Sequence, residues 1–377
     1  MKLATAAGFP ATTAMAMTAE DVKASDSDQV TISFDISGRV KKTVDADWYD
    51  HVQRSKQVRD NIESKYFRRD GIVGVGIAND TEHYVSVVLD ANHPDKDERR
   101  GELPERKKDV RIEFEEQDGN PSPAHGDVSC ESHEGPCNDQ TTGNSSVPGG
   151  VKAGPYFKED CTLGPQTIPG GCKVFGRGWS LPAHCLTTCH DVMEGDDNCT
   201  STRACEPVVQ EEIFHNMTRI GRTICYDEAL DFAYIEQDST ASPEPEIVLP
   251  SDHSNKVHIK DSVGNSGLDT IMDNQKYTVT TRGKTSCEVE GNPIDKRDVT
   301  RSVDDYCRDE VILQVKTTFD NTHLADGDSG SVFWITDNGN NFAVTLLSNN
   351  FCGAGLPQYG PQAPSIQDRN NVWWSDQ

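Results

Sequence analysis

Hydrophobic residues are scarce in this sequence, and long apolar runs are missing from it. They make up 34% of the 377 residues, and no stretch approaches the roughly 20 apolar residues that a membrane-spanning helix requires. We therefore expect no insertion into a membrane. The length still suffices for two or three domains with cores of their own.

Basic residues are also few. The chain has 36 Lys and Arg against 62 Asp and Glu, which gives a formal net charge of −26 at pH 7. Nucleic acids and anionic membranes are held by positive charge, so we expect neither as a partner. Such an acidic surface is typical of proteins adapted to high salt, where ions screen the self-repulsion. The composition favours a halophilic, haloarchaeal source, with an ordinary acidic secreted protein as the alternative.

Cysteine, by contrast, is frequent. The count is twelve, which permits complete pairing and favours an oxidising, extracellular compartment. One segment could instead hold zinc, but its spacings match no regular ligand pattern, so disulfides are favoured. That segment contains His184, Cys185, Cys189, His190, Cys199 and Cys205.

The N-terminus is similar to a secretory signal. Residues 1–20 are small and weakly apolar, with Ala14 and Ala16 placed as at a cleavage site. They resemble the part of a twin-arginine signal that follows the arginine pair. We expect export, by that route, and hypothesise that the natural start lies upstream of Met1.

The segments that follow predict a small domain. A helical pattern over residues 46–67 precedes strand-like runs at 71–77, 83–89 and 109–115. We expect an α+β accessory domain or pro-domain over 21–117. A linker over 118–148, a second domain over 149–365 and a tail over 366–377 complete the expected organisation.

The most informative stretch runs from Asp326 to Ser331, with the sequence Asp-Gly-Asp-Ser-Gly-Ser, and an apolar run follows it. Glycine lets a backbone turn tightly and direct its N–H groups to one point. Such a turn can expose Ser329 while the N–H groups of Gly327 and Ser329 hold a developing oxyanion. A serine hydroxyl becomes a nucleophile only when a base removes its proton, and a third group must orient that base.

A histidine and an aspartate for these tasks lie upstream. His184 ends the apolar segment 179–184 and is followed by Cys185, and Asp231 begins the strand-like run 231–235. The three motifs, in the order His, Asp, Ser, resemble those of the chymotrypsin-like serine peptidases; subtilisins and α/β-hydrolases have other orders. The sequence Cys-Thr-Leu-Gly at 161–164 is similar to one in the bacterial, streptogrisin-like branch. The resemblance covers about residues 149–360.

The resemblance implies a catalytic triad of His184, Asp231 and Ser329, an oxyanion hole of Gly327 and Ser329, and no metal or organic cofactor. It implies an all-β fold of two six-stranded barrels and a secreted serine endopeptidase that cleaves proteins or peptides through an acyl-enzyme. It makes no prediction about an oligomer. Each motif alone also fits a structural explanation: an ordinary turn, a core histidine, a strand-end cap. A catalytically silent binding protein on the same fold is the alternative function, and an esterase with the same triad is a further one.

The resemblance also implies disulfides and a substrate pocket. It pairs Cys161 with Cys185, and Cys287 with Cys307 is a plausible second pair. It places His323 at the base of the pocket and the strand 345–350 along its wall, so that the expected substrate-binding residues are His323, Ser348 and Asn350. Because no acidic residue stands at the base position, a preference for Arg or Lys is not supported.

Overall fold

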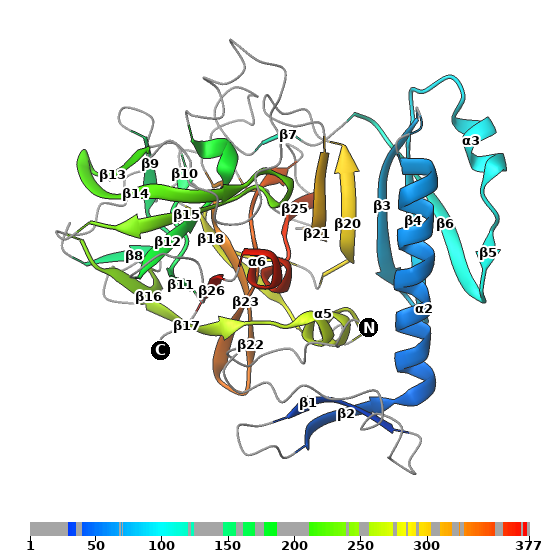
Figure 1. Ribbon diagram of the computed structural model, residues 1–377, viewed down its shortest axis with the longest axis horizontal. Helices are drawn as coiled ribbons and strands as arrows, with labels where there is room; N and C mark the ends of the chain where they lie inside the picture. Colours follow the sequence, from blue (N-terminus) through cyan, green and yellow to red (C-terminus); the bar gives the residue numbers. More distant parts are fainter. Residues whose placement is uncertain are drawn as a thin grey trace. The chain divides into compact units, whose positions relative to one another are not determined.

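The computed structural model divides the chain into two compact units (Figure 1). Unit 1 comprises residues 1–119 and 263–274, and unit 2 comprises residues 120–262 and 275–377. The structure describes residues 29–34, 40–67, 69, 71–119, 122–123, 146–155, 161–169, 177–186, 211–238, 241–248, 256–273, 277–283, 286–291, 294–302, 310–318, 324, 328–350, 357–370 and 372–374. The expected signal segment lies outside these residues.

Unit 1 is built around helix α2 (Ala46–Ile62), which packs on a hairpin of β3 (Ile72–Asn79) and β4 (His83–Asp90). The side chain of Asp45 accepts the N–H groups of residues 47 and 48 and so caps the helix. Strand β6 (Val110–Gln117) pairs in parallel with β4. The helix and the strands expected from the sequence are confirmed. The other elements of the segment 1–119 are β1 (Gln29–Phe34), β2 (Val40–Asp45), the π-helical turn η1 (Glu63–Phe67), α3 (Lys96–Glu102) and β5 (Arg106–Lys107).

Unit 1 also includes a helix from the later part of the chain, which the sequence analysis does not predict. Helix α5 (Asn265–Asp273) lies between two strands of unit 2 in sequence, yet its contacts are with unit 1. The side-chain nitrogen of Asn79 lies 2.7 Å from a carboxylate oxygen of Asp273, and Lys56 pairs with Asp269 at 3.4 Å. Its nine residues give too short a pattern for the helical period to be recognised.

Unit 2 consists mainly of antiparallel β-strands, which we describe as three sets in order of pairing (Figure 1). The first set is β10 (Cys161–Thr162), β9 (Lys152–Pro155), β13 (Glu212–His215), β14 (Thr218–Asp227), β15 (Phe232–Gln237), β12 (Gly178–Leu181), β11 (Gln166–Pro169) and β26 (Val372–Trp374). The second is β19 (Cys287–Gly291), β18 (Val279–Gly283), β22 (Val332–Asp337), β23 (Asn340–Leu346), β17 (Lys256–Ser262), β16 (Pro243–Val248) and β8 (Val147–Gly149). The third is β20 (Lys296–Ser302), β21 (Glu310–Thr318), β25 (Pro357–Pro361), β24 (Asn349–Asn350) and β7 (Ser122–Pro123).

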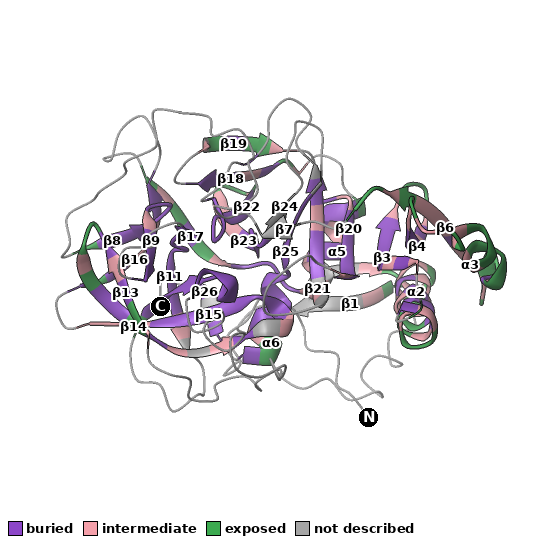
Figure 2. Cartoon of the chain, turned by 90° about the horizontal axis from the view of Figure 1, so that it is seen from above, coloured by how far each residue is buried: buried purple, intermediate pink, exposed green. Residues whose placement is uncertain are grey.

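Strand β15 separates two hydrophobic cores of unit 2. Its residues Ala233 and Ile235 belong to one core, and Phe232 and Tyr234 belong to the other. Successive side chains of a strand point to opposite faces, so β15 is buried on both sides. Figure 2 shows the burial of β15, whose first four residues are all buried. Asp231, which directly precedes β15, therefore lies where the two cores meet.

The architecture confirms the expected fold class, an all-β chymotrypsin-like domain with a small α+β domain before it in sequence. The strand sets differ from two sheets of six because β20 and β21, of seven and nine residues, form a third set with β25. The first set also gains β26, in the stretch expected to be a tail. Its Trp374 is fully buried and pairs with Thr167 of β11, and helix α6 (Ala363–Asn370) precedes it.

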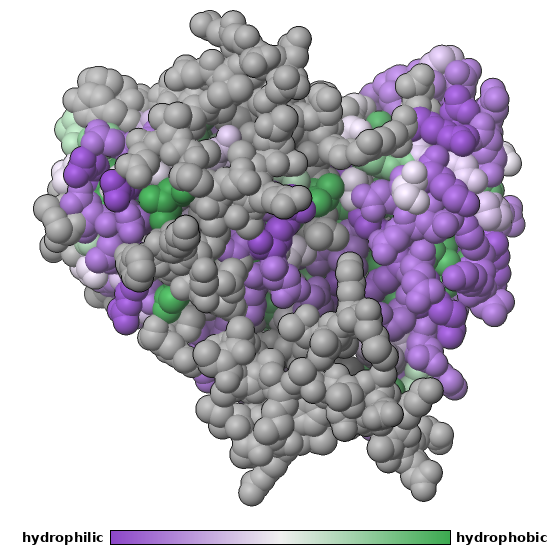
Figure 3. Space-filling view, in the orientation of Figure 1, coloured by the Kyte–Doolittle hydropathy of each residue, from purple (hydrophilic) through white to green (hydrophobic). Residues whose placement is uncertain are grey.

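The surface agrees with the polar composition. On the face shown in Figure 3, hydrophilic residues cover most of the described surface. Met217, 78% exposed, is the large hydrophobic side chain that protrudes among the described residues. No helix in the described part of the chain is both long and apolar enough to cross a membrane.

Candidate active site

Three separate segments of unit 2 bring His184, Asp231 and Ser329 together. His184 lies in the 3-10 turn η2 (Ala183–Cys185) after β12, and Asp231 follows the 3-10 turn η3 (Glu228–Leu230). His184 Nδ1 is 2.6 Å from Asp231 Oδ2, and His184 Nε2 is 3.0 Å from Ser329 Oγ. The three side chains thus form one continuous hydrogen-bonded chain.

The hydrogen bonds of Asp231 assign the proton positions in this chain. A carboxylate only accepts, so Nδ1 of His184 carries a proton and Nε2 is the acceptor that faces the hydroxyl of Ser329. The other carboxylate oxygen accepts the backbone N–H of His184 at 2.9 Å. All three residues are almost completely buried, His184 at 2% exposure being the most accessible. Burial from water strengthens each of these charge-assisted bonds.

The turn that carries Ser329 depends on the glycine after it. Gly330 has a φ of +96°, its N–H donates to the carbonyl oxygen of Leu347 at 2.8 Å, and Thr162 N–H donates to the carbonyl of Ser329 at 2.6 Å. A Cβ on Gly330 would lie 1.9 Å from the carbonyl oxygen of Thr162. The position therefore tolerates no side chain, both because of its backbone angle and because of the strand beside it.

Replacing Gly330 by alanine should destabilise unit 2 by about 3 kcal/mol or more, because strain and a backbone clash add. Gly339 gives a matched control: its φ is +76° and nothing lies within 4 Å of a Cβ placed there. Gly339→Ala should cost only about 1–2 kcal/mol. Denaturant unfolding of both variants measures the difference, and equal losses would show that the contact with Thr162 is unimportant.

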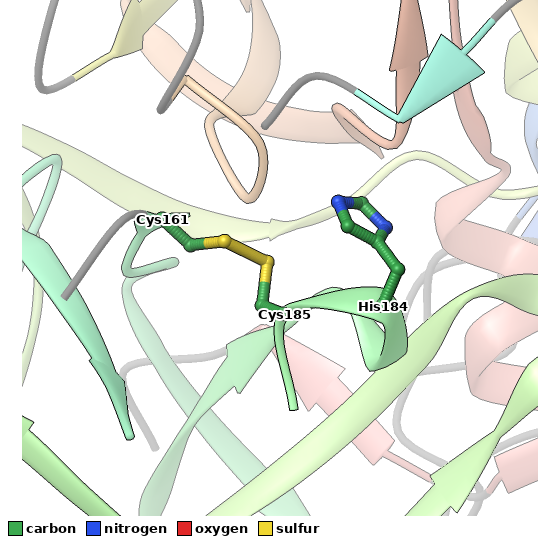
Figure 4. A group of neighbouring side chains, drawn as sticks. All are labelled: Cys161, His184 and Cys185. Atoms are coloured by element: carbon green, nitrogen blue, oxygen red, sulfur yellow. A yellow bond between two sulfur atoms is a disulfide. The ribbon is translucent and has the colours of Figure 1, made fainter. Parts of the chain in front are cut away.

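A disulfide joins the segments on either side of this site. Cys161 and Cys185 are bonded, as expected from the sequence, and Figure 4 shows the bond beside His184. Cys185 follows the histidine, and Cys161 precedes the Thr162 that hydrogen-bonds to Ser329. The bond therefore links the backbone beside the histidine to the strand that contacts the serine turn.

Cys161, His184 and Cys185 also lie close enough together to suggest a metal site. However, the two sulfur atoms are bonded to each other, so neither is a thiolate that could bind a metal ion. The imidazole of His184 is already engaged by Asp231 and Ser329. Cys161 and Cys185 therefore offer no thiolate for zinc, and only His184 of this group belongs to the hydrogen-bonded chain.

A buried arginine lies near the residue that precedes Ser329. Arg282 is fully buried, and within the described part of the chain its guanidinium nitrogens have no hydrogen-bond partner. Burial lowers its pKa to about 10, against the opposing effect of the nearby carboxylates of Glu288 and Asp328. Asp328 itself accepts the N–H of Ser286 at 3.2 Å. The positive charge of Arg282 thus lies close to the carboxylate of the residue that precedes Ser329.

Ser348, one of the expected substrate-binding residues, hydrogen-bonds to Asp231, and its contact with a substrate stays a prediction. Its hydroxyl donates to Asp231 Oδ2, and its N–H donates to the carbonyl of Tyr359 at 3.0 Å. Ser348 thus adds a third donor to the carboxylate that orients His184. The two residues are 117 positions apart in the chain, and no local motif joins them, so this contact could not be predicted from the sequence.

Removing the hydroxyl with Ser348→Ala should lower turnover about tenfold to a hundredfold, since a hydrogen bond to a charged group contributes roughly 1.5–3 kcal/mol. Steady-state hydrolysis of a peptide ester measures this. Ser262→Ala is the control, because Ser262 is also buried but donates to Gln367 at 3.1 Å. A Ser348→Ala variant with the turnover of the control would show that this donor is unnecessary.

The other predicted site residues are described only in part. Asn350 lies in β24, where it pairs with Gln358 of β25, and its side chain is not described. His323, Gly327 and Cys307 lie outside the described residues, as does the side chain of Cys287. The oxyanion hole, the pocket base and the second disulfide therefore stay predictions.

No protein-family model matches this chain, and no curated protein matches it. Solved structures of bacterial chymotrypsin-like serine proteases are similar to it at low identity. Nocardiopsis protease is 13% identical, with 60% of this chain and 98% of that chain covered and a TM-score of 0.40. Thermobifida fusca protease A is 14% identical over 60% and 97%, and Cellulomonas bogoriensis chymotrypsin is 12% identical over the same shares, both with a TM-score of 0.40.

Proposed function

We propose that this protein is a serine endopeptidase that hydrolyses peptide bonds through an acyl-enzyme. The observation that supports this most strongly is the hydrogen-bonded chain from Ser329 Oγ through His184 to Asp231 Oδ2. Three distant segments supply its members, and each member is buried. With the proton of His184 on Nδ1, Nε2 can accept the proton of Ser329, as nucleophilic catalysis requires.

In the proposed mechanism, Ser329 Oγ attacks the scissile carbonyl carbon while Nε2 of His184 takes the hydroxyl proton. Asp231 stabilises the imidazolium that forms. The C–N bond breaks as the imidazolium returns that proton to the leaving amine, which leaves an ester on Ser329. Water, deprotonated by His184, then hydrolyses the ester and regenerates the serine. We assign the oxyanion to the N–H groups of Gly327 and Ser329.

The proposal includes an extracellular location and peptide substrates. The disulfide beside His184 supports an oxidising compartment. We also propose that residues 1–20 are a signal that directs export of the protein, and that residues 21–117 are a pro-domain or accessory domain. The net charge of −26 favours adaptation to high salt. His323, Ser348 and Asn350 are the proposed substrate-binding residues, as in the sequence analysis.

Pre-steady-state hydrolysis of an activated ester, in high-salt buffer, tests this function. We expect a burst of alcohol release equal to the enzyme concentration, followed by slower turnover, because the acyl-enzyme accumulates. The same protein preparation should also cleave a mixture of peptides, and mass spectrometry should detect the new peptide termini. Cleavage of the ester without any cleavage of peptides would favour the esterase alternative. A folded protein that cleaves neither substrate would favour the binding protein.

A further inference from the structure

The segment formed by α6 and β26 contacts the strand that leads to His184 and the strand that leads to the turn before Asp231. Strand β26 pairs with β11, and the indole N–H of Trp374 donates to Ser180 Oγ at 3.3 Å. Ser180 lies in β12, which leads directly to His184. The last two residues of α6, Arg369 and Asn370, bond to Asp227, which in turn bonds to the turn before Asp231. One short stretch of chain thus contacts the supports of the general base and of the acid that orients it.

Asp227 is the junction between helix α6 and that turn. It is fully buried, and its Oδ2 accepts Arg369 Nε at 2.5 Å and Asn370 Nδ2 at 3.3 Å. Its Oδ1 accepts the backbone N–H of Leu230 at 3.3 Å. Leu230 is the last residue of the 3-10 turn η3 and immediately precedes Asp231. A single carboxylate thus joins two α6 side chains to the backbone beside Asp231.

The backbone at Asp231 needs such support. Its φ is +53°, in the left-handed region that residues with a side chain rarely adopt. An aspartate accepts this angle only when its surroundings determine it. The hydrogen bond from the N–H of Leu230 to Asp227 fixes Leu230, the residue before Asp231. The carboxylate of Asp227 in turn requires a cation, because a buried charge without a partner is strongly unfavourable.

We propose that Arg369 is a positioning residue for the catalytic pair. Its ion pair keeps the carboxylate of Asp227 in place, Asp227 holds the end of the turn, and the turn sets the Asp231 carboxylate against His184. This inference rests on the proposed peptidase function. Arg369 touches none of the reacting groups in this account and acts only through Asp227. Its side chain is 37% exposed, so a substitution there need not disrupt the core.

The test compares three variants in ester hydrolysis and in proton NMR. Arg369→Met removes the charge and retains the aliphatic part, and we expect turnover to fall roughly tenfold to a hundredfold with little change in KM. The far-downfield proton of the His184–Asp231 hydrogen bond should shift or broaden. Arg369→Lys should restore most of the turnover, because an ammonium can still pair with Asp227. Arg222→Met is the control, since Arg222 lies on β14 like Asp227 but makes an exposed ion pair with Glu236 at 3.2 Å.

The results separate this inference from the proposed function. If the wild type hydrolyses the ester and Arg369→Met has the turnover and the downfield signal of the Arg222 control, the positioning role is wrong. If Arg369→Met lowers stability but leaves both readouts unchanged in the folded fraction, Arg369 is only structural and the inference is equally overturned. A wild type that is folded but hydrolyses nothing would instead overturn the proposed function. The downfield proton would then still report whether Arg369 affects the His184–Asp231 bond.

Discussion

Replacing Ser329 by alanine should reduce peptide hydrolysis roughly 10⁶-fold while the protein stays folded. In the proposed mechanism the hydroxyl of Ser329 is the only nucleophile, and removing one member of a complete triad costs about as much as removing all three. The methyl group of alanine fits the buried position, because it is smaller than the side chain that it replaces. Initial rates with a peptide substrate, at equal concentrations of folded protein, measure the effect.

The same experiment needs a serine that is buried but outside the site. Ser262→Ala meets this need, and its rate should stay within a few-fold of the wild type. If a Ser329→Ala preparation that is free of contaminating protease retained more than about one thousandth of the wild-type rate, another residue would be the nucleophile.

Replacing Asp231 by asparagine should lower turnover about 10⁴-fold. Its two oxygens accept three groups: the N–H and Nδ1–H of His184 and the hydroxyl of Ser348. Asparagine has one oxygen and one NH₂ group, so one of its two orientations leaves a donor facing the N–H of His184. The other orientation directs NH₂ at Nδ1, which forces the ring proton onto Nε2. His184 can then no longer accept the proton of Ser329.

Asp337→Asn is the matched control for this change. Asp337 accepts the hydroxyl of Tyr277 at 3.2 Å in the same unit, and its replacement should leave turnover unchanged. Single-turnover rates with an activated ester separate the chemical step from substrate binding. An Asp231→Asn variant within tenfold of the wild type would contradict the assigned proton positions.

The sequence predicted the parts of the fold whose information is local. The hairpin of β3 and β4 consists of two apolar runs rich in valine and isoleucine around a turn sequence, and α2 has a helical pattern after its Asp45 cap. The three motifs around His184, Asp231 and Ser329 are likewise local, and their order restricted the family. The site could be predicted to this extent because each motif combines a functional residue with its own backbone context.

The contacts that the sequence did not predict join residues far apart in the chain. Ser348 and Asp231 are separated by 117 positions, and Arg369 and Asp227 by 142. No periodicity or turn sequence relates such pairs, because only the folded chain brings them together. Helix α5 escaped prediction for another reason: its nine residues form few repeats, and its contacts are made in unit 1.

The central claim is that Ser329 is an activated nucleophile, and labelling with a fluorophosphonate tests it most directly. Wild type and Ser329→Ala would be treated in high-salt buffer, digested, and mapped by mass spectrometry. We predict one covalent adduct, on Ser329 of the wild type, and none on the variant. Absence of any adduct on folded wild-type protein, or an adduct on a different serine, would contradict the proposed mechanism.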